Sequence, residues 1–364
     1  MSRLLAMVTA GLSLSVLVGA SFCGMAGGLP PLPDGAFTYV VLPDTQLYHG
    51  KGSNSDPSAP TSNPAFRSRM DWILGNLERE RIVFVSHVGD IVDRRTPFQW
   101  RFASDLVAEL DGKVPFGLSV GNHDAEDGDA VRSGFVGAFP AKRYADYPWY
   151  VGNFGDNANS CQLFEAGGFK FVVLHLECNA PEPVLSWADS MLEKYADRHA
   201  VIVTHMYLGY LTREQDQLRR GMDLANPPGY GDWFGVMNWS KVHGKDGVSP
   251  QRAWDICFSR HRNLFLILCG DQSMATTWRQ LQFGSNGNWV YSVLQDYPRT
   301  ADREDWLRLL RFVPSRGEIQ VLTYSPCQDR LCDDAGFWHG EQWHQFVLTV
   351  PWLKKGPAED VQLW

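Results

Sequence analysis

Four short polar segments each directly follow an apolar, β-branched run, an arrangement that few folds can accommodate. They are Asp44-Thr45-Gln46, Gly89-Asp90-Ile91-Val92-Asp93, Gly121-Asn122-His123-Asp124 and Thr204-His205. The apolar runs at 37–42 and 82–88 have the length of buried strands, and helical spacing of apolar residues follows at 64–79 and 98–110. Alternating strands and helices predict an α/β fold, in which side chains at the carboxyl ends of strands meet where ligands bind.

Further along, the pattern predicts a hairpin of strands 160–165 and 169–177, joined by Ala166-Gly167-Gly168. The remaining expected elements are helices 184–195 and 250–260, and strands 116–120, 200–204, 264–268, 288–294, 306–313, 318–324 and 346–350. The stretch 208–249 is too long for a plain connection, so we interpret it as an insertion that forms a lid or rim. One domain from 36 to 350, followed by a tail at 351–364, accommodates these elements.

Composition narrows the classes of partner. The chain has 364 residues, of which 44% are hydrophobic and 20% charged, as is usual for a globular protein. Its formal net charge is −8, and no Lys/Arg cluster supplies the basic surface expected of a nucleic-acid-binding protein. A small phosphorylated substrate remains compatible, because bound metal ions reverse the local field.

The N-terminus has the features of a signal peptide. Arg3 precedes an apolar stretch from Leu4 to Ala20, and small residues follow it. We predict a cleaved signal over 1–26, a Gly/Pro-rich linker over 27–35, an exported protein, and no membrane span in the mature chain. The alternative is a permanent membrane anchor, although the stretch is short for a spanning helix.

Cysteine content agrees with export. The chain has seven cysteines, and removing a signal that includes Cys23 leaves six. An even number in an exported protein permits disulfides, and Cys327 with Cys332 is the best candidate pair because both flank a turn-like segment.

The residue types at the strand ends suit metal ions. Carboxylate, amide and imidazole groups together suit Mn, Fe or Zn. Asp90 and Asp93 share one turn, where their charges repel unless a cation or a donor lies between them. Two metal ions held by Asp, Asn and His are a standard device for hydrolysing phosphate esters.

In these motifs the chain resembles the calcineurin-like metallophosphoesterase superfamily, whose pattern is D-x-H, G-D-x-x-D, G-N-H-[DE], a lone His, and G-H-x-H. More narrowly, it is similar to exported bacterial members that carry D-T-Q in the first motif. The resemblance extends from about residue 36 to 350. It implies a four-layer α/β/β/α sandwich with two mixed β-sheets, and two divalent metal ions (Mn, Fe, Zn or Mg).

The resemblance also implies a role for each matching residue. Asp44 would bind the first metal and Asp90 would bridge both, while Asn122 and His205 would bind the second. His123 would protonate the leaving alkoxide or steady the phosphate. Asp124 would orient the His123 ring.

Two positions depart from the family pattern. Gln46 stands where a metal-binding His is usual, and its carbonyl suits Mn or Mg better than Fe or Zn. Gly270-Asp271-Gln272-Ser273 replaces G-H-x-H. Asp271 can act as an oxygen ligand of the second metal, whereas Ser273 is a weak substitute, so we expect weaker or more selective binding at the first metal site.

The sequence thus predicts a metal-dependent phosphoesterase that cleaves mono- or diesters with a metal-bound hydroxide. Two alternatives remain: a weakened, phosphate-binding relative, and an exported module that binds carbohydrate or envelope polymers through the Trp-rich insertion. We expect His87 and His175 to be hydrogen-bonded core residues. His49 next to the first motif, and His243 in the insertion, are weaker candidates for the site.

Overall fold

A computed structural model of the chain describes residues 28–125, 133–208, 242–271, 277–297, 305–333 and 343–354. The predicted signal at 1–26 lies outside these residues, as do Gln272, Ser273 and most of the predicted insertion. No helix in the described part of the chain has both the length and the apolar character needed to cross a membrane.

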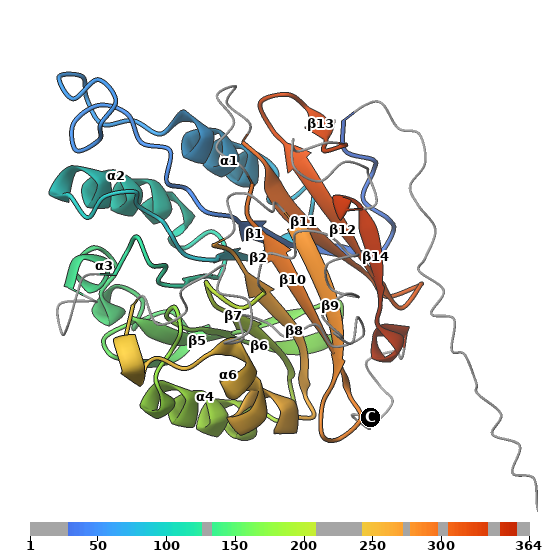
Figure 1. Ribbon diagram of the computed structural model, residues 1–364. Helices are drawn as coiled ribbons and strands as arrows, with labels where there is room; N and C mark the ends of the chain where they lie inside the picture. The colour runs from blue at the N-terminus through green and yellow to red at the C-terminus, as the bar shows by residue number, and fades with distance from the viewer. Residues whose placement is uncertain are drawn as a thin grey trace, which may run out of the picture.

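Two mixed β-sheets form the centre of the molecule (Figure 1). The first contains, in spatial order, β13 (Arg330–Leu331), β12 (Glu318–Ser325), β11 (Leu307–Val313), β1 (Phe37–Leu42), β2 (Ile82–His87) and β3 (Phe116–Leu118), with β14 (Phe346–Thr349) beside β12. The second contains β4 (Tyr150–Phe154), β5 (Asn159–Ala166), β6 (Phe169–His175), β7 (His199–Val203), β8 (Leu264–Cys269), β10 (Trp289–Gln295) and β9 (Thr277–Phe283). Strands β1, β2 and β3 run parallel, as do β6, β7, β8 and β10.

Helices cover the outer face of each sheet (Figure 1). The first sheet packs against α1 (Pro64–Gly75), α2 (Pro97–Val107) and α3 (Ser133–Ala138), and the second against α4 (Glu182–Lys194) and α6 (Pro250–Ile256). Short 3-10 helices occur at Ala108–Leu110, Ala141–Arg143, Gly244–Asp246, Phe258–Arg260 and Pro351–Lys354. This layering confirms the predicted α/β/β/α sandwich.

Local sequence explains where the outer helices begin. Asn63 caps α1 by accepting the backbone N–H of Phe66, and Thr96 caps α2 in the same way. Proline occupies the first helical position in both, where its missing N–H costs nothing. α1 ends at Gly75, four residues before the predicted end, because Gly75-Asn76 is a pair of weak helix formers.

An apolar core fills the space between the sheets. Tyr39 and Phe84 from the first sheet pack against Phe164 from the second, and all three are buried. Leu353, in the short helix that follows β14, is buried in the same core. The sheets are therefore held together by aromatic and aliphatic packing over most of their shared surface.

One polar network crosses this core through His175. The hydroxyl of Tyr39 lies 2.5 Å from Ser86 Oγ, which lies 2.7 Å from His175 Nε2. His175 Nδ1 lies 2.8 Å from Gln162 Oε1. Tyr39 and Ser86 belong to the first sheet, and Gln162 and His175 to the second. His175 is thus the hydrogen-bonded core residue that the sequence predicted.

The disulfide expected between Cys327 and Cys332 is not formed. Cys327 is exposed, whereas Cys332 is buried beside Tyr297 and Trp306.

Candidate metal centre

Five candidate ligand residues lie at the carboxyl ends of strands from both sheets. Asp44, Asp90 and Asn122 follow β1, β2 and β3 in the first sheet, and His205 and Asp271 follow β7 and β8 in the second. Ligand atoms of Asp44, Asp90 and His205 all lie within 4.8 Å of one another. The structure therefore brings together residues more than 160 positions apart, as the strand-end pattern predicted.

The loop after β2 is built to bring Asp90 close to the neighbouring strand ends. Gly89 and Asp90 both have left-handed backbone conformations, with φ of 107° and 53°. A Cβ on Gly89 would lie 2.7 Å from His205 Nδ1, and one on Gly121 would lie 2.1 Å from the backbone nitrogen of Asp90. Neither glycine position has room for a side chain, so both residues must be glycine. The left-handed conformation is strained for Asp90, which has a side chain, and such strain is typical of functional sites.

His205 is held in one orientation by a contact between the sheets. Its Nδ1 lies 2.9 Å from the carbonyl oxygen of Val88, so Nδ1 carries the hydrogen and donates it. Nε2 lies 3.2 Å from Asp90 Oδ1 and 3.5 Å from Asp271 Oδ1. A histidine whose far nitrogen is fixed by a carbonyl oxygen directs the lone pair of its other nitrogen at a metal ion.

The charges around Asp44 fit a cation. Burial and the nearby charge of Asp296 raise the pKa of Asp44 well above its ordinary value. Burial acts the same way on Asp90, but the neighbouring His205 outweighs it and lowers the pKa of Asp90. Asp44 Oδ1 is buried without a hydrogen-bond partner in the described chain. A Cβ on Gly270 would lie 2.4 Å from that oxygen, so the glycine keeps the space beside it open.

Gln46 contacts Asp90 directly. Its side-chain amide donates to Asp90 Oδ2, while Asp90 Oδ1 accepts the backbone N–H of His123 at 2.8 Å. Gln46 is buried beside the proposed bridging carboxylate. The carbonyl oxygen of its amide is the atom that would serve as the predicted ligand.

The contacts of Asp124 differ from the predicted role. Its carboxylate accepts three backbone N–H groups, from Ile91, Val92 and Gly121, at 2.9 to 3.1 Å. Burial and the charge of Asp90 raise the pKa of Asp124 to about 6. Asp124 therefore joins two site loops through their backbones.

The contact expected between Asp124 and the His123 ring is made by Asp93 instead. His123 Nδ1 lies 2.9 Å from the Asp93 carbonyl oxygen and 3.7 Å from its carboxylate. The pairing of Asp90 with Asp93 in one turn was visible in the sequence. The direction of the His123 ring was not, because it depends on how two loops from different strands meet.

The remaining histidines near the motifs have structural partners. His87 Nε2 lies 3.0 Å from the Thr45 hydroxyl, and its Nδ1 accepts the backbone N–H of Gly89. Burial lowers the pKa of His87 to about 3, so it joins the first two motifs as a neutral core residue, as predicted. His49 is exposed and contacts Ser55, within its own loop.

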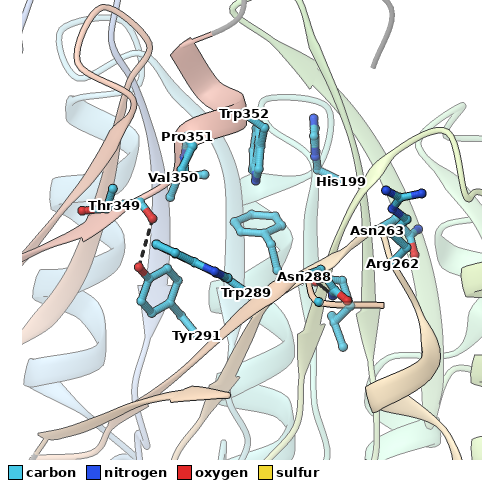
Figure 2. Close-up of a pocket in the computed structure, with 13 residues that line it drawn as sticks. His199, Arg262, Asn263, Asn288, Trp289, Tyr291, Thr349, Val350, Pro351 and Trp352 are labelled. Atoms are coloured by element: carbon cyan, nitrogen blue, oxygen red, sulfur yellow. Dashed lines mark hydrogen bonds between the residues drawn. The ribbon is translucent and has the colours of Figure 1, made fainter. Parts of the chain in front are cut away.

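A cavity of about 380 Å³ opens at the amino ends of the parallel strands of the second sheet (Figure 2). His199 begins β7, and its ring stacks on Trp352 with centroids 3.5 Å apart. Trp289 and Tyr291 line the cavity from β10. Asp and Glu are absent from its described lining, whereas the candidate ligands lie at the opposite, carboxyl ends of the strands.

A sequence model of calcineurin-like phosphoesterases matches residues 37–272, a range that contains all of these strand-end residues. The chain belongs to the calcineurin-like phosphoesterase family.

Individual relatives of this phosphoesterase are distant. The uncharacterized protein YvnB of Bacillus subtilis (strain 168) is 24% identical over 305 residues, which cover 82% of this chain and 20% of YvnB. This chain therefore spans about a fifth of that relative's length. NAD nucleotidase of Haemophilus influenzae is 10% identical with a TM-score of 0.38, covering 80% of this chain and 48% of its own. GAP50 of Plasmodium is 10% identical with a TM-score of 0.40, and the match covers 85% of this chain and 89% of GAP50.

The sequence analysis did not identify Glu177, a fully buried acid two residues after the end of β6. Its position after an apolar strand is the same signal that identified the other segments. Because the predicted strand extended to Glu177, this residue was counted as part of the strand and not as a polar residue that follows it.

Proposed function

We propose that this phosphoesterase hydrolyses phosphate mono- or diesters with two divalent cations held between its sheets. The observation that supports this most is the convergence of Asp44, Asp90 and His205, from two sheets, within 4.8 Å. Asp44, Asp90 and Gln46 would hold the first cation. Asp90, Asn122, His205 and Asp271 would hold the second.

Cations bound there would supply Lewis acidity, lowering the pKa of a water molecule and neutralising phosphate charge. The chain's own residues have separable tasks. Asp90 receives the His123 N–H and the Gln46 amide, so its oxygens are fixed before any ligand arrives. Asp124 holds the two loops that carry Asp90 and Asn122 in register through backbone hydrogen bonds.

His123 is the proposed general acid. Because Nδ1 is engaged by Asp93, the transferable proton would be carried on Nε2. Protonation of a poor leaving alkoxide by such an imidazole typically contributes about 10²–10⁴-fold to the rate. The Asp93 carboxylate, 3.7 Å from Nδ1, stabilises the charged ring.

The first test uses the purified chain. Bound metals are measured, and nitrophenyl mono- and diesters are assayed with added Mn, Fe, Zn or Mg. We expect turnover with at least one metal, and Asp90→Asn should lower it by at least about 100-fold, because even outer-shell changes around a metal cost about 10–100-fold. Asp111→Asn is the matched control, since Asp111 pairs with Arg143 at 3.0 Å and is not one of the candidate ligands.

Other outcomes would change the assignment. Absence of turnover with every metal, together with binding of inorganic phosphate, would favour the weakened, phosphate-binding alternative. Metal-free protein that binds polysaccharide would favour the carbohydrate or envelope-polymer module. Unchanged turnover in Asp90→Asn would contradict the bridging role.

Export is part of the same proposal. The apolar stretch before the linker supports a cleaved signal over 1–26, which would place the activity outside the cytoplasm. N-terminal sequencing of the mature protein tests this, and an intact Met1 on the secreted or membrane-bound protein would contradict cleavage.

A further inference from the structure

A second carboxylate–imidazole pair lies beside the metal centre, outside the five motif segments. His243 Nε2 is 3.3 Å from Glu177 Oε2, and the Glu177 side chain is fully buried. Asn159 holds Glu177 from two directions: its Nδ2 donates to Glu177 Oε1 at 2.9 Å, and its Oδ1 accepts the Glu177 backbone N–H at 2.8 Å. The carboxylate is therefore fixed before it meets His243.

The backbone around Glu177 is joined to two of the strand ends that carry candidate ligands. The carbonyl oxygen of Glu177 accepts the hydroxyl of Thr204, the residue directly before His205. The next backbone N–H, from Cys178, donates to Val120, two residues before Asn122. Cys178 packs against Met206, the residue directly after His205. Glu177 thus follows β6 at the same edge as the ligands.

His243 reaches this edge from the segment that precedes α6. Val242 packs against Cys178 and Met206, the latter directly after His205. The N–H of Val248 donates to the carbonyl oxygen of Asn179 at 3.3 Å. The segment 242–248 is therefore attached over the ends of β6 and β7, the edge that also carries His205.

The chemistry of the pair decides what His243 can recognise. A carboxylate can only accept hydrogen bonds, so a neutral His243 ring carries its hydrogen on Nε2, facing Glu177. The lone pair is then on Nδ1, which makes no hydrogen bond within the described chain. Such a nitrogen accepts a hydrogen bond from an O–H group.

We propose that His243, oriented by Glu177, accepts a hydrogen bond from a hydroxyl group on the alcohol part of the substrate. This rests on the proposed phosphoesterase function and narrows its substrates to esters of polyhydroxylated alcohols. His243 is a substrate-contacting residue that determines specificity, and Glu177 is a positioning residue that acts through it.

The test compares two substrates that differ in hydroxyl groups. They are glycerol 1-phosphate and propyl phosphate for a monoesterase, or their methyl diesters for a diesterase. The wild type should prefer the glycerol ester in kcat/KM by about tenfold, the value of one good hydrogen bond. His243→Phe should lower kcat/KM for the glycerol ester by about tenfold more than kcat/KM for the propyl ester, and so remove that preference. Glu177→Gln should lower the preference, mainly through KM, because the amide no longer dictates which ring nitrogen carries the hydrogen.

His261→Phe is the matched control. His261 forms another imidazole–carboxylate pair, 2.7 Å from Asp189, on the outer face of the second sheet. His261→Phe should change kcat/KM for neither of the two substrates. Metal content and thermal unfolding temperature, measured on each variant, separate loss of recognition from loss of folding. If His243→Phe is unstable, Glu177→Gln tests the same proposal.

Two failures are distinguishable. If the wild type turns over no phosphate ester, nitrophenyl esters included, the proposed function falls. If it hydrolyses nitrophenyl esters but shows no preference for the glycerol ester, or if His243→Phe slows both alkyl esters equally, the proposed role of His243 is overturned while the phosphoesterase function stands.

Discussion

Replacing His175 should change how the stability of this protein depends on pH. His175 is fully buried between the sheets, where Ser86 donates to its Nε2 and Gln162 accepts from its Nδ1. The contact with Ser86 needs a neutral ring, because only an unprotonated Nε2 accepts a hydrogen. Burial accordingly lowers the pKa of His175 from 6.5 to about 3.

The sign and size of the effect follow from linkage. In the unfolded chain His175 binds a proton below its ordinary pKa of 6.5, whereas in the folded chain it does so only near 3. Its contribution to stability is therefore complete above pH 6.5 and is lost as the pH falls toward 3. At pH 5 the loss is about 2 kcal/mol, because each pH unit below the unfolded pKa costs about 1.4 kcal/mol.

His175→Gln removes this titration together with the two hydrogen bonds. At pH 7 the variant should be less stable than the wild type by about 1–3 kcal/mol, because buried polar groups lose their partners. At pH 5 this deficit should shrink by about 2 kcal/mol, since only the wild type carries the cost of the neutral ring. Urea unfolding of both proteins at the two pH values measures the difference, in which all other titrating groups cancel.

His49→Gln, which removes an exposed imidazole, supplies the baseline for this comparison. An equal deficit for His175→Gln at pH 7 and pH 5 would refute the reasoning. It would mean that the folded protein accepts a proton on His175 as readily as the unfolded chain does.

Two further changes test packing and charge. Gly117→Ala would place a Cβ 2.2 Å from the His175 ring and should destabilise the fold by about 1–3 kcal/mol in urea unfolding. Gly75→Ala meets nothing within 4 Å at the end of α1, so it should be neutral or stabilise by up to about 1 kcal/mol. Glu80→Gln breaks a buried pair with Arg311, whose atoms are 2.6 Å apart, and should cost about 3–5 kcal/mol.

The matched control for the last change is Glu318→Gln, which removes the partner of the exposed Arg316 and should cost less than about 1 kcal/mol. If Glu80→Gln and Glu318→Gln lower the free energy of unfolding equally, burial of the Glu80–Arg311 pair does not determine how much that pair contributes to stability. If Gly117→Ala is tolerated like Gly75→Ala, the space beside His175 is larger than the structure shows.

Hydrophobic pattern predicted the central strands well and the edges poorly. β9 was missed because its pattern is reversed: Gln280 and Gln282 are buried, whereas Phe283 is exposed. Its partner β10 supplies the backbone hydrogen bonds that hold it in the sheet. β4 was missed because four of its five residues are only partly buried and the fifth is exposed, so no clean alternation marks it.

The site shows a similar division. Positions of Asp44, Asp90 and His205 at strand ends were predictable, because parallel strands present their carboxyl ends at one edge. The partners of Asp124 were not, because its carboxylate accepts N–H groups from a loop about thirty residues away. Asp93 and Glu177 contact His123 and His243 only where separate loops meet, which sequence spacing does not encode.

The hydrogen bond from His205 to Val88 means that the distance between the two sheets affects how a candidate metal ligand is oriented. The imidazole follows a strand of one sheet, and the carbonyl oxygen that orients it follows a strand of the other. If cations bind as proposed, a substitution deep between the sheets would alter metal affinity without touching a ligand, and bound metal would in turn resist separation of the sheets. The metal affinity measured by titration would then depend on the relative position of the two sheets as well as on the ligands at the strand ends.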